Sequence, residues 1–208
     1  MIKDKNETEA ESAHRVEASE QLSPVGRKLF QYIEFDPNEE LLSEIRKHPI
    51  GVFGIALTGI FITLAIVIST FVLAASLPGM NLGVSEDSAI KGVLVSIGLI
   101  LGFLGMAVTA IAIVIYVRNV IYVTSQKVAQ VNYISLFNRK VTQLGIGNIE
   151  DVTVHQRGIL AHIFGYATLQ IETAGELPNP EFSLVPKPYP ESRIMIEAHE
   201  KYVEKFGN

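Results

Sequence analysis

Two long segments without charged residues dominate the pattern of apolar and polar positions in this chain. The first runs from Pro49 to Ser85 and is densely apolar from Ile50 to Leu77, and the second runs from Gly92 to Val117. A helix needs roughly 20 apolar residues to cross the hydrocarbon core of a bilayer. Both segments exceed this length, so the pattern predicts a transmembrane α-helical hairpin over residues 49–117, with helices near 50–77 and 92–117.

The second apolar segment carries a row of small residues, Gly98, Gly102, Gly105 and Thr109. Their spacings of four, three and four place them on one face of a helix. Small residues four apart let two helix backbones approach closely, so this face either packs against the first helix or joins two chains in a homo-oligomer. Neither segment contains an ionisable residue, which disfavours a proton pump or an ion carrier.

Basic residues flank the hairpin on the side of the two termini. Arg46 and Lys47 precede the first helix, Arg118 and Lys127 follow the second, and the loop between the helices holds only Lys91. Because the side richer in Lys and Arg stays cytoplasmic, both termini are expected in the cytoplasm. The first residues lack the apolar core of a signal peptide, so the first helix is expected to act as the insertion signal.

The segment before the hairpin divides into two parts. Residues 1–21 are polar and rich in glutamate, which predicts a disordered acidic tail. Residues 22–48 form a juxtamembrane segment with a turn at Asp36-Pro37. Beyond that turn, Leu41, Leu42 and Ile45 have helical spacing. This part is either a short interfacial helix or a strand that docks on the domain after the hairpin.

Residues 118–208 show short alternating stretches that end in an amphipathic segment. The clearest strand is Thr168 to Thr173, where Leu169 and Ile171 alternate with polar residues. A final helix is expected to begin near Pro190 and to carry one apolar stripe, formed by Met195, Ala198, Tyr202 and Phe206. The pattern predicts an α+β domain, an antiparallel bent sheet or partial barrel covered by a C-terminal helix.

Composition narrows the chemistry that the chain can perform. The formal net charge of −5 gives no basic footprint for nucleic acid, and the absence of cysteine excludes disulfides and thiolate metal sites. No catalytic, metal or cofactor site is predicted, because the histidines have no paired metal-binding spacing; they are His14, His48, His155, His162 and His199. An enzyme acting on lipid would need a cleft at the membrane face that combines His155 or His162 with a carboxylate.

Four stretches carry a resemblance to a known family. In chain order they are Asp36-Pro37 with Glu39, Glu40, Leu42, Arg46 and His48; Tyr122-Val123-Thr124 with Lys127; Ile149-Glu150-Asp151-Val152 with Val154; and Ile163-Phe164-Gly165-Tyr166 with Leu169, Ile171, Glu172, Thr173, Ala174 and Gly175. Together they resemble the bacterial pleckstrin-homology-like (PH) domain of the YdbS type, which occurs in small bacterial membrane proteins.

The resemblance implies where each stretch lies. In the same order, they are the segment just before the first helix, the opening strand of the domain, its central strand and its most recognisable stretch. It implies a seven-stranded bent sheet capped by a C-terminal helix and held at the inner face of the cell membrane. No enzymatic activity comes with the family. Lys127 stands where arginine is usual, and Ala167 stands where glycine is expected.

Two groups of residues are candidates for contact with a ligand or a partner. Arg139 and Lys140 are predicted in a turn between two strands, where each would attract an anionic lipid headgroup by about 1 kcal/mol. An apolar patch either contacts a protein partner or fills the core of the domain; its members are Ile159, Leu160, Ile163 and Phe164.

The sequence therefore predicts a membrane-anchored PH-like module that binds partners at the inner membrane face without catalysis. Its expected partners are the lipid bilayer and proteins of the same membrane. The alternative is a small accessory subunit of a transport or export complex that contacts its partners through the transmembrane helices.

Overall fold

The computed structural model describes residues 5–76, 84–174 and 179–206. The chain forms two compact units. Met1–Pro49 and Ile115–Asn208 together form one unit, which we call the head domain, and Ile50–Val114 form the other, which we call the hairpin.

The hairpin consists of the two helices expected from the apolar segments, α3 (Ile50–Ser76) and α4 (Val84–Val117). Helix α4 begins earlier than expected, because Val84 to Lys91 are helical rather than part of a loop. Both helices are long and apolar enough to cross a membrane, by length and composition.

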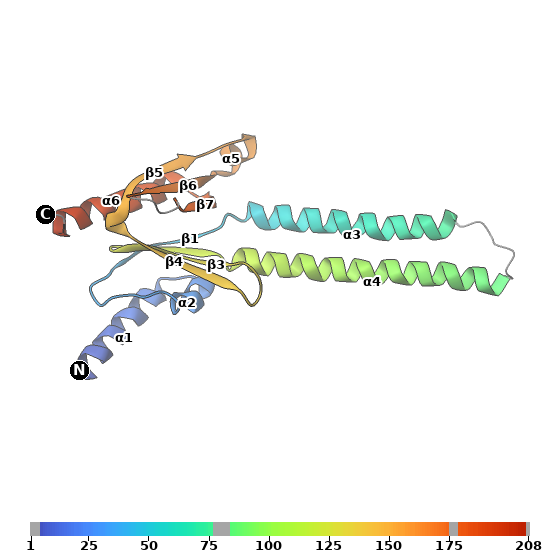
Figure 1. Ribbon diagram of the computed structural model, residues 1–208, viewed down its shortest axis with the longest axis horizontal. Coiled ribbons are helices and arrows are strands. Elements are labelled where there is room, and N and C mark those ends of the chain that lie inside the picture. Colours follow the sequence, from blue (N-terminus) through green and yellow to red (C-terminus); the bar gives the residue numbers. More distant parts are fainter. Residues whose placement is uncertain (1–4, 77–83, 175–178, 207–208) are drawn as a thin grey trace. The chain divides into compact units, whose positions relative to one another are not determined.

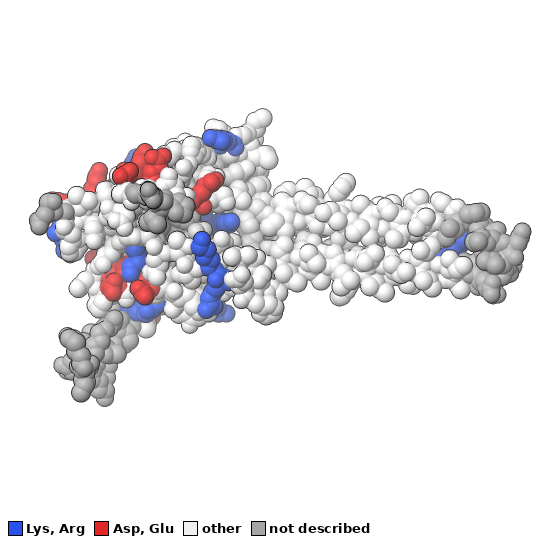
Figure 2. Space-filling model, in the orientation of Figure 1, with Lys and Arg blue, Asp and Glu red and all other residues white. Residues whose placement is uncertain are grey.

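The apolar side chains of the hairpin face outward. Only 6% of the most apolar window of α3 and 11% of that of α4 are buried. The core helix of a soluble protein would instead be mostly buried. Figure 2 shows that the visible face of both helices carries neither acidic nor basic side chains over most of its length, whereas the head domain carries both.

The head domain contains two antiparallel sheets and a C-terminal helix (Figure 1). The order of the four-stranded sheet is β1-β2-β3-β4, and that of the three-stranded sheet is β5-β6-β7. The strands are β1 (Leu41–Arg46), β2 (Val120–Thr124), β3 (Lys127–Tyr133), β4 (Arg139–Gly145), β5 (Ile149–His155), β6 (Tyr166–Thr173) and β7 (Glu181–Pro186). The helical elements between and after them are η1 (Ile146–Asn148), α5 (Ile159–Phe164) and α6 (Pro188–Phe206).

The first strand of the head domain precedes the hairpin. Strand β1 pairs with β2, with Ile45 opposite Ile121 and Arg46 opposite Val120. The segment that sequence left open between helix and strand is thus a strand, and the domain is not confined to residues 118–208.

Tyr122-Val123-Thr124 lie in the second strand rather than the opening one, and β5 is an edge strand rather than the central one.

The main core lies between the two sheets and α6. Alternating residues of β5 and β6 point into it, as the pattern of Leu169 and Ile171 predicted, and α6 adds the expected Met195 and Ala198. Proline lies in the first turn of α6, where its missing N–H is not needed, although the helix begins at Pro188 and not at Pro190. The buried cluster comprises Ile45, Ile121, Val123, Val128, Ile146, Ile149, Val152, Leu169, Ile171, Phe182, Val185, Met195 and Ala198.

A second core covers the other face of the four-stranded sheet. Helices α1 (Lys5–Glu20) and α2 (Pro24–Phe30) and the segment after them supply one side of it, and β2 and β3 supply the other. Its buried members are Ala18, Leu22, Leu29, Phe30, Ile33, Phe35, Val120, Tyr122, Ala129 and Val131.

The N-terminal segment is therefore helical over Lys5–Glu20, where sequence predicted disorder. The Arg15 guanidinium donates hydrogen bonds to the carbonyl oxygens of Phe30 and Ile33 at 2.8 and 2.7 Å, and these bonds hold the end of α1 against the domain. Burial of Tyr122 beneath this layer raises the pKa of its phenol, which donates a hydrogen bond to the Gly26 carbonyl at 2.6 Å.

A buried carboxylate joins the N-terminal segment to the turn between β2 and β3. The Glu39 side chain is fully buried, and its Oε2 lies 3.1 Å from Lys127 Nζ and accepts a hydrogen bond from the Asp36 amide at 3.0 Å. The Thr124 hydroxyl donates to Oε1 of the same carboxylate. Two of the four stretches that resemble the PH-like family thus meet in one ion pair.

Replacing Lys127 with Met is expected to destabilise the head domain by about 3–5 kcal/mol, because Glu39 then stays buried without its countercharge. Replacement with Arg keeps the charge and is expected to cost less. Urea unfolding of the full chain in mild detergent, followed by the near-ultraviolet circular dichroism of the tyrosines, measures the difference. Lys140→Met is the matched control, since Lys140 is exposed and should change stability by no more than about 0.5 kcal/mol. Equal effects of the two Met variants would contradict the prediction.

Candidate functional site

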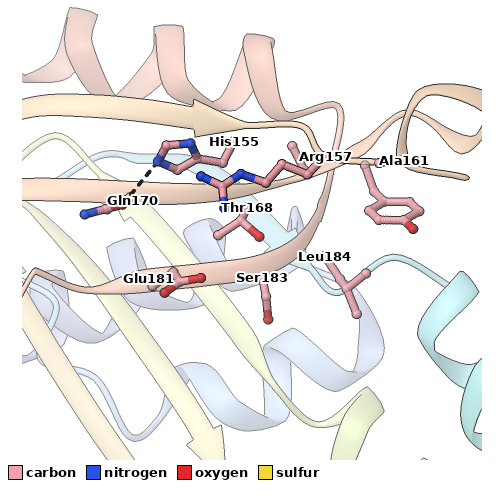
Figure 3. Close-up of a pocket in the computed structure, with 10 residues that line it drawn as sticks. His155, Arg157, Ala161, Thr168, Gln170, Glu181, Ser183 and Leu184 are labelled. Atoms are coloured by element: carbon pink, nitrogen blue, oxygen red, sulfur yellow. Dashed lines mark hydrogen bonds between the residues drawn. The ribbon is translucent and has the colours of Figure 1, made fainter. Parts of the chain in front are cut away.

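A groove of about 410 Å³ lies on the outer face of the three-stranded sheet. Its polar lining comes from β5 and the segment after it, from β6 and from β7, and the rest of its wall comes from α5, β6 and β7 (Figure 3). The polar residues are His155, Arg157, Thr168, Gln170, Glu181 and Ser183, and Ala161, Tyr166, Ala167 and Leu184 complete the wall.

Strand alternation explains why polar side chains gather here. In β6, Leu169 and Ile171 point into the core, so Thr168 and Gln170 point to the opposite face. Sequence predicted this alternation, but it gave no reason to place β5 and β7 on either side of β6. The groove was therefore missed, because its residues come from three strands that only the sheet brings together.

The groove combines a histidine with a carboxylate, because His155 and Glu181 both line it (Figure 3). This is the residue combination that an enzyme acting on lipid would need. His155 Nε2 lies 3.2 Å from Gln170 Oε1. Among the described residues, no group of three or more His, Cys, Asp or Glu side chains could hold a metal ion.

Helix α5 carries an exposed apolar surface beside the groove. The predicted patch does not fill the core: Ile159, Leu160, Ile163 and Phe164 are all exposed, and only Ala161 of this helix is buried. Glycines border the helix on both sides. Gly158 (φ 93°) and Gly165 (φ 69°) adopt backbone conformations that residues with a Cβ rarely take, so the chain turns sharply at both ends of α5.

The groove and α5 lie next to the point where the chain leaves the head domain. The His48 ring is 5.4 Å from the Tyr166 ring, and the His48 amide donates a hydrogen bond to the Leu184 carbonyl at 2.7 Å. Tyr116, on the returning chain, donates its hydroxyl to the His48 carbonyl at 2.7 Å. Lys47 Nζ lies 5.5 Å from the centre of the Tyr116 ring, and burial lowers the pKa of Lys47.

The predicted basic pair, Arg139 and Lys140, lies elsewhere. These residues are the first two of β4, opposite Tyr133 and Asn132, and not part of the turn as expected. The Arg139 guanidinium stacks over the Tyr32 ring at 3.5 Å, so part of its surface is already used by the N-terminal layer. The pair does not line the groove.

The row of small residues on α4 faces α3 within the hairpin. A Cβ added to Gly98 would meet Thr70, one added to Gly102 would meet Val67, and one added to Gly105 would meet Thr63. Thr109 faces Gly59 in the same way. The order of these contacts shows that the helices run antiparallel, and that this face serves contacts inside one chain.

Residues 49–199 match a protein-family model described as Bacterial PH domain. The match covers more than half of the chain, so the chain belongs to the bacterial PH domain family. It includes the hairpin and strands β2 to β7, while β1 lies before it. Bacterial PH domains are binding modules and are typically non-catalytic.

Comparison with curated proteins gives no match. The solved structures that resemble the chain include a DUF1696 family protein with a pleckstrin-homology domain from Shewanella loihica PV-4. The sequence identity is 10%, and the TM-score is 0.35. The alignment covers 40% of this chain and 73% of the solved chain.

Gly105→Ala is expected to destabilise the helix pair by about 1–3 kcal/mol, because overpacking forces neighbouring groups apart. The new Cβ would lie 2.8 Å from Thr63 Oγ1 but 3.8 Å from Thr63 Cβ, so adding Thr63→Ala should restore the packing. Gly92→Ala, with open space around its Cβ, is the control. Stability of the helix pair is measured by titrating dodecyl sulfate into detergent micelles. The midpoint is the mole fraction of dodecyl sulfate at which energy transfer between fluorophores on α3 and α4 is lost. Failure of Thr63→Ala to rescue would contradict the assigned contact.

Proposed function

We propose that this chain is a membrane-anchored binding module in which the hairpin crosses the bilayer and the head domain presents a partner-binding groove without catalysis. The observation that carries the proposal is the insertion of two long, outward-facing apolar helices, uncharged over residues 50–76 and 92–117, between the first and second strands of a PH-like sheet. Exposed apolar surface of this length is stable in lipid and not in water.

Attachment by both ends of the hairpin restricts how the head domain moves above the membrane. A tethered domain meets partners of the same membrane at a high effective concentration, which raises apparent affinity without any new contact. We propose both termini in the cytoplasm, at the inner membrane of a bacterial cell, because Arg46, Lys47 and Arg118 flank the helices on the head side.

The proposed interaction surface is the groove beside α5. Its lining offers the Arg157 guanidinium, the His155 ring, the Gln170 amide and hydroxyls as hydrogen-bonding groups, and the Glu181 carboxylate as an acceptor. This mixture suits a polar peptide segment of a protein partner better than a ligand of one charge sign.

We also propose that the chain belongs to the YdbS type within the family. The Glu39–Lys127 ion pair supports this assignment, because it gives a joint structural role to two stretches that carry the resemblance. The alternative, an accessory subunit that binds through its helices, gains no support from the small-residue face, which α3 already occupies.

Replacing Ile50–Val114 with a short Asn/Gly linker is expected to release the head domain into the soluble fraction with its fold retained. The strands on either side of the linker are antiparallel neighbours, so a short turn can join them. The full chain should stay in the membrane pellet after an alkaline carbonate wash. Recovery of the full chain in the supernatant would contradict the membrane anchor, and a reporter at Asn208 that is reachable from outside intact cells would contradict the orientation.

A photo-crosslinking amino acid at Ser183 is expected to capture a discrete partner in native membranes. The same probe at Glu172, an exposed position of β6 outside the groove, is the matched control. Adding Arg157→Ala should lower the crosslinking yield at Ser183 about tenfold, because losing one hydrogen bond to a charged group costs about 1.5 kcal/mol. An equal product from both positions, or a yield unchanged by Arg157→Ala, would argue against the groove.

A further inference from the structure

We propose that the head domain also contacts the bilayer directly, through two exposed apolar tips that dip into the interface of the leaflet from which the hairpin enters. The first tip is α5, with Ile159, Leu160, Ile163 and Phe164. The second tip is the turn between β3 and β4, with Ile134 and Phe137. The inference rests on the proposed membrane anchor and adds a lipid-binding surface that borders the groove at α5 and Arg157.

Both tips expose large apolar side chains that the fold of the head domain does not bury. Phe137 is 97% exposed and Ile159 is 79% exposed. Folded proteins rarely leave such clusters in water unless the clusters meet a partner or a membrane. Two positive-φ glycines, Gly158 and Gly165, border α5, and within this helix only Ala161 is buried.

The second tip lies beside the point where the chain re-enters the head domain. The Tyr133 amide, one residue before the turn, donates a hydrogen bond to Asn119 Oδ1 at 2.6 Å. The Arg118 guanidinium lies 5.6 Å from the centre of the Tyr133 ring. Arg118 directly follows the last residue of α4, so this turn is held next to one end of the proposed membrane span.

The first tip lies beside the point where the chain leaves the head domain. The ring of Tyr166, which follows α5 after one residue, lies 5.4 Å from the His48 ring, and His48 precedes the first residue of α3 by two positions. The Lys187 amide donates to the Gly165 carbonyl at 3.2 Å and secures the same corner. The chain passes between the head domain and the hairpin at two places, which we call crossing points. The tips belong to different parts of the head domain, yet each lies beside a crossing point. A lipid surface at the crossing points would therefore reach both.

Charge separates along the strands in the direction that an anionic leaflet favours. Exposed basic residues accompany the tips at the crossing-point ends of the strands: Arg118, Arg139, Lys140, Arg157 and Lys187. The exposed carboxylates of Glu150, Asp151 and Glu172 lie at the opposite ends of β5 and β6, where Ile149 pairs with Thr173. Lys and Arg beside an anionic lipid surface add attraction to the burial of the apolar side chains.

The test uses the full chain in vesicles of phosphatidylcholine and phosphatidylglycerol. The chain has no cysteine, so single cysteines at Phe137, Ile163 and the control Glu172 each carry one polarity-sensitive fluorophore. All three positions are exposed, and the substitutions leave both cores intact. We expect probes at 137 and 163 to emit at shorter wavelength, to be quenched by lipid-attached nitroxide and to be protected from acrylamide. The probe at 172 should show the opposite behaviour.

The outcomes separate this inference from the membrane anchor. If the chain floats with the vesicles but the probes at 137 and 163 behave like the one at 172, the tips stay in water and the inference is wrong while the anchor stands. Protection from acrylamide without nitroxide quenching would show that protein, such as a second copy of the chain, covers the tips, and would also overturn it. If the chain does not float with the vesicles, the anchor itself is wrong.

Discussion

The pairing of β1 with β2 is the constraint on which the rest of this structure depends. Arg46 lies opposite Val120, although the entire hairpin separates them in sequence. Because the two strands are antiparallel neighbours, the chain must leave the sheet and return to it at adjacent positions. An insertion with adjacent ends is most simply an antiparallel pair of helices, and the contacts between Gly98 and Thr70 and between Gly59 and Thr109 show that pair. The hairpin thus replaces what would otherwise be a tight β-turn.

The two-sided burial of the four-stranded sheet explains the role of the N-terminal segment. Every residue of β2 is buried, since one face meets the main core and the other meets Phe30, Ile33 and Phe35. Without that layer, Val120 and Tyr122 would be exposed on an open sheet face, at about 25 cal/mol for each Å² of apolar surface left in water. The buried Glu39 carboxylate holds the layer in place. The Lys127 ammonium and the Thr124 hydroxyl offset the cost of burying this carboxylate, because one supplies a countercharge and the other a hydrogen bond.

The same topology places the proposed interaction surfaces at one end of the head domain. The hairpin crossing points, the β3–β4 turn, α5 and the start of α6 all fall at the same ends of their strands. In this chain the loop between β1 and β2 has become the proposed anchor. The groove and the two apolar tips lie at the end of the head domain where the chain leaves it and returns to it.

The sequence by itself determined what depends on local pattern. The length and apolarity of Ile50–Leu77 and Gly92–Val117 predicted the two long helices, the alternation of Leu169 and Ile171 predicted β6, and the stripe through Met195 and Ala198 predicted the buried face of α6. Only the tertiary structure decided what depends on pairing across the chain. Local pattern left Leu41–Arg46 open between helix and strand, and pairing with β2 makes it a strand. Local pattern also left the apolar patch of α5 open between core and surface, and the fold exposes it. Side chains of His155, Gln170 and Ser183 become one groove only because three strands are hydrogen-bonded in a fixed register, and no local pattern encodes that register.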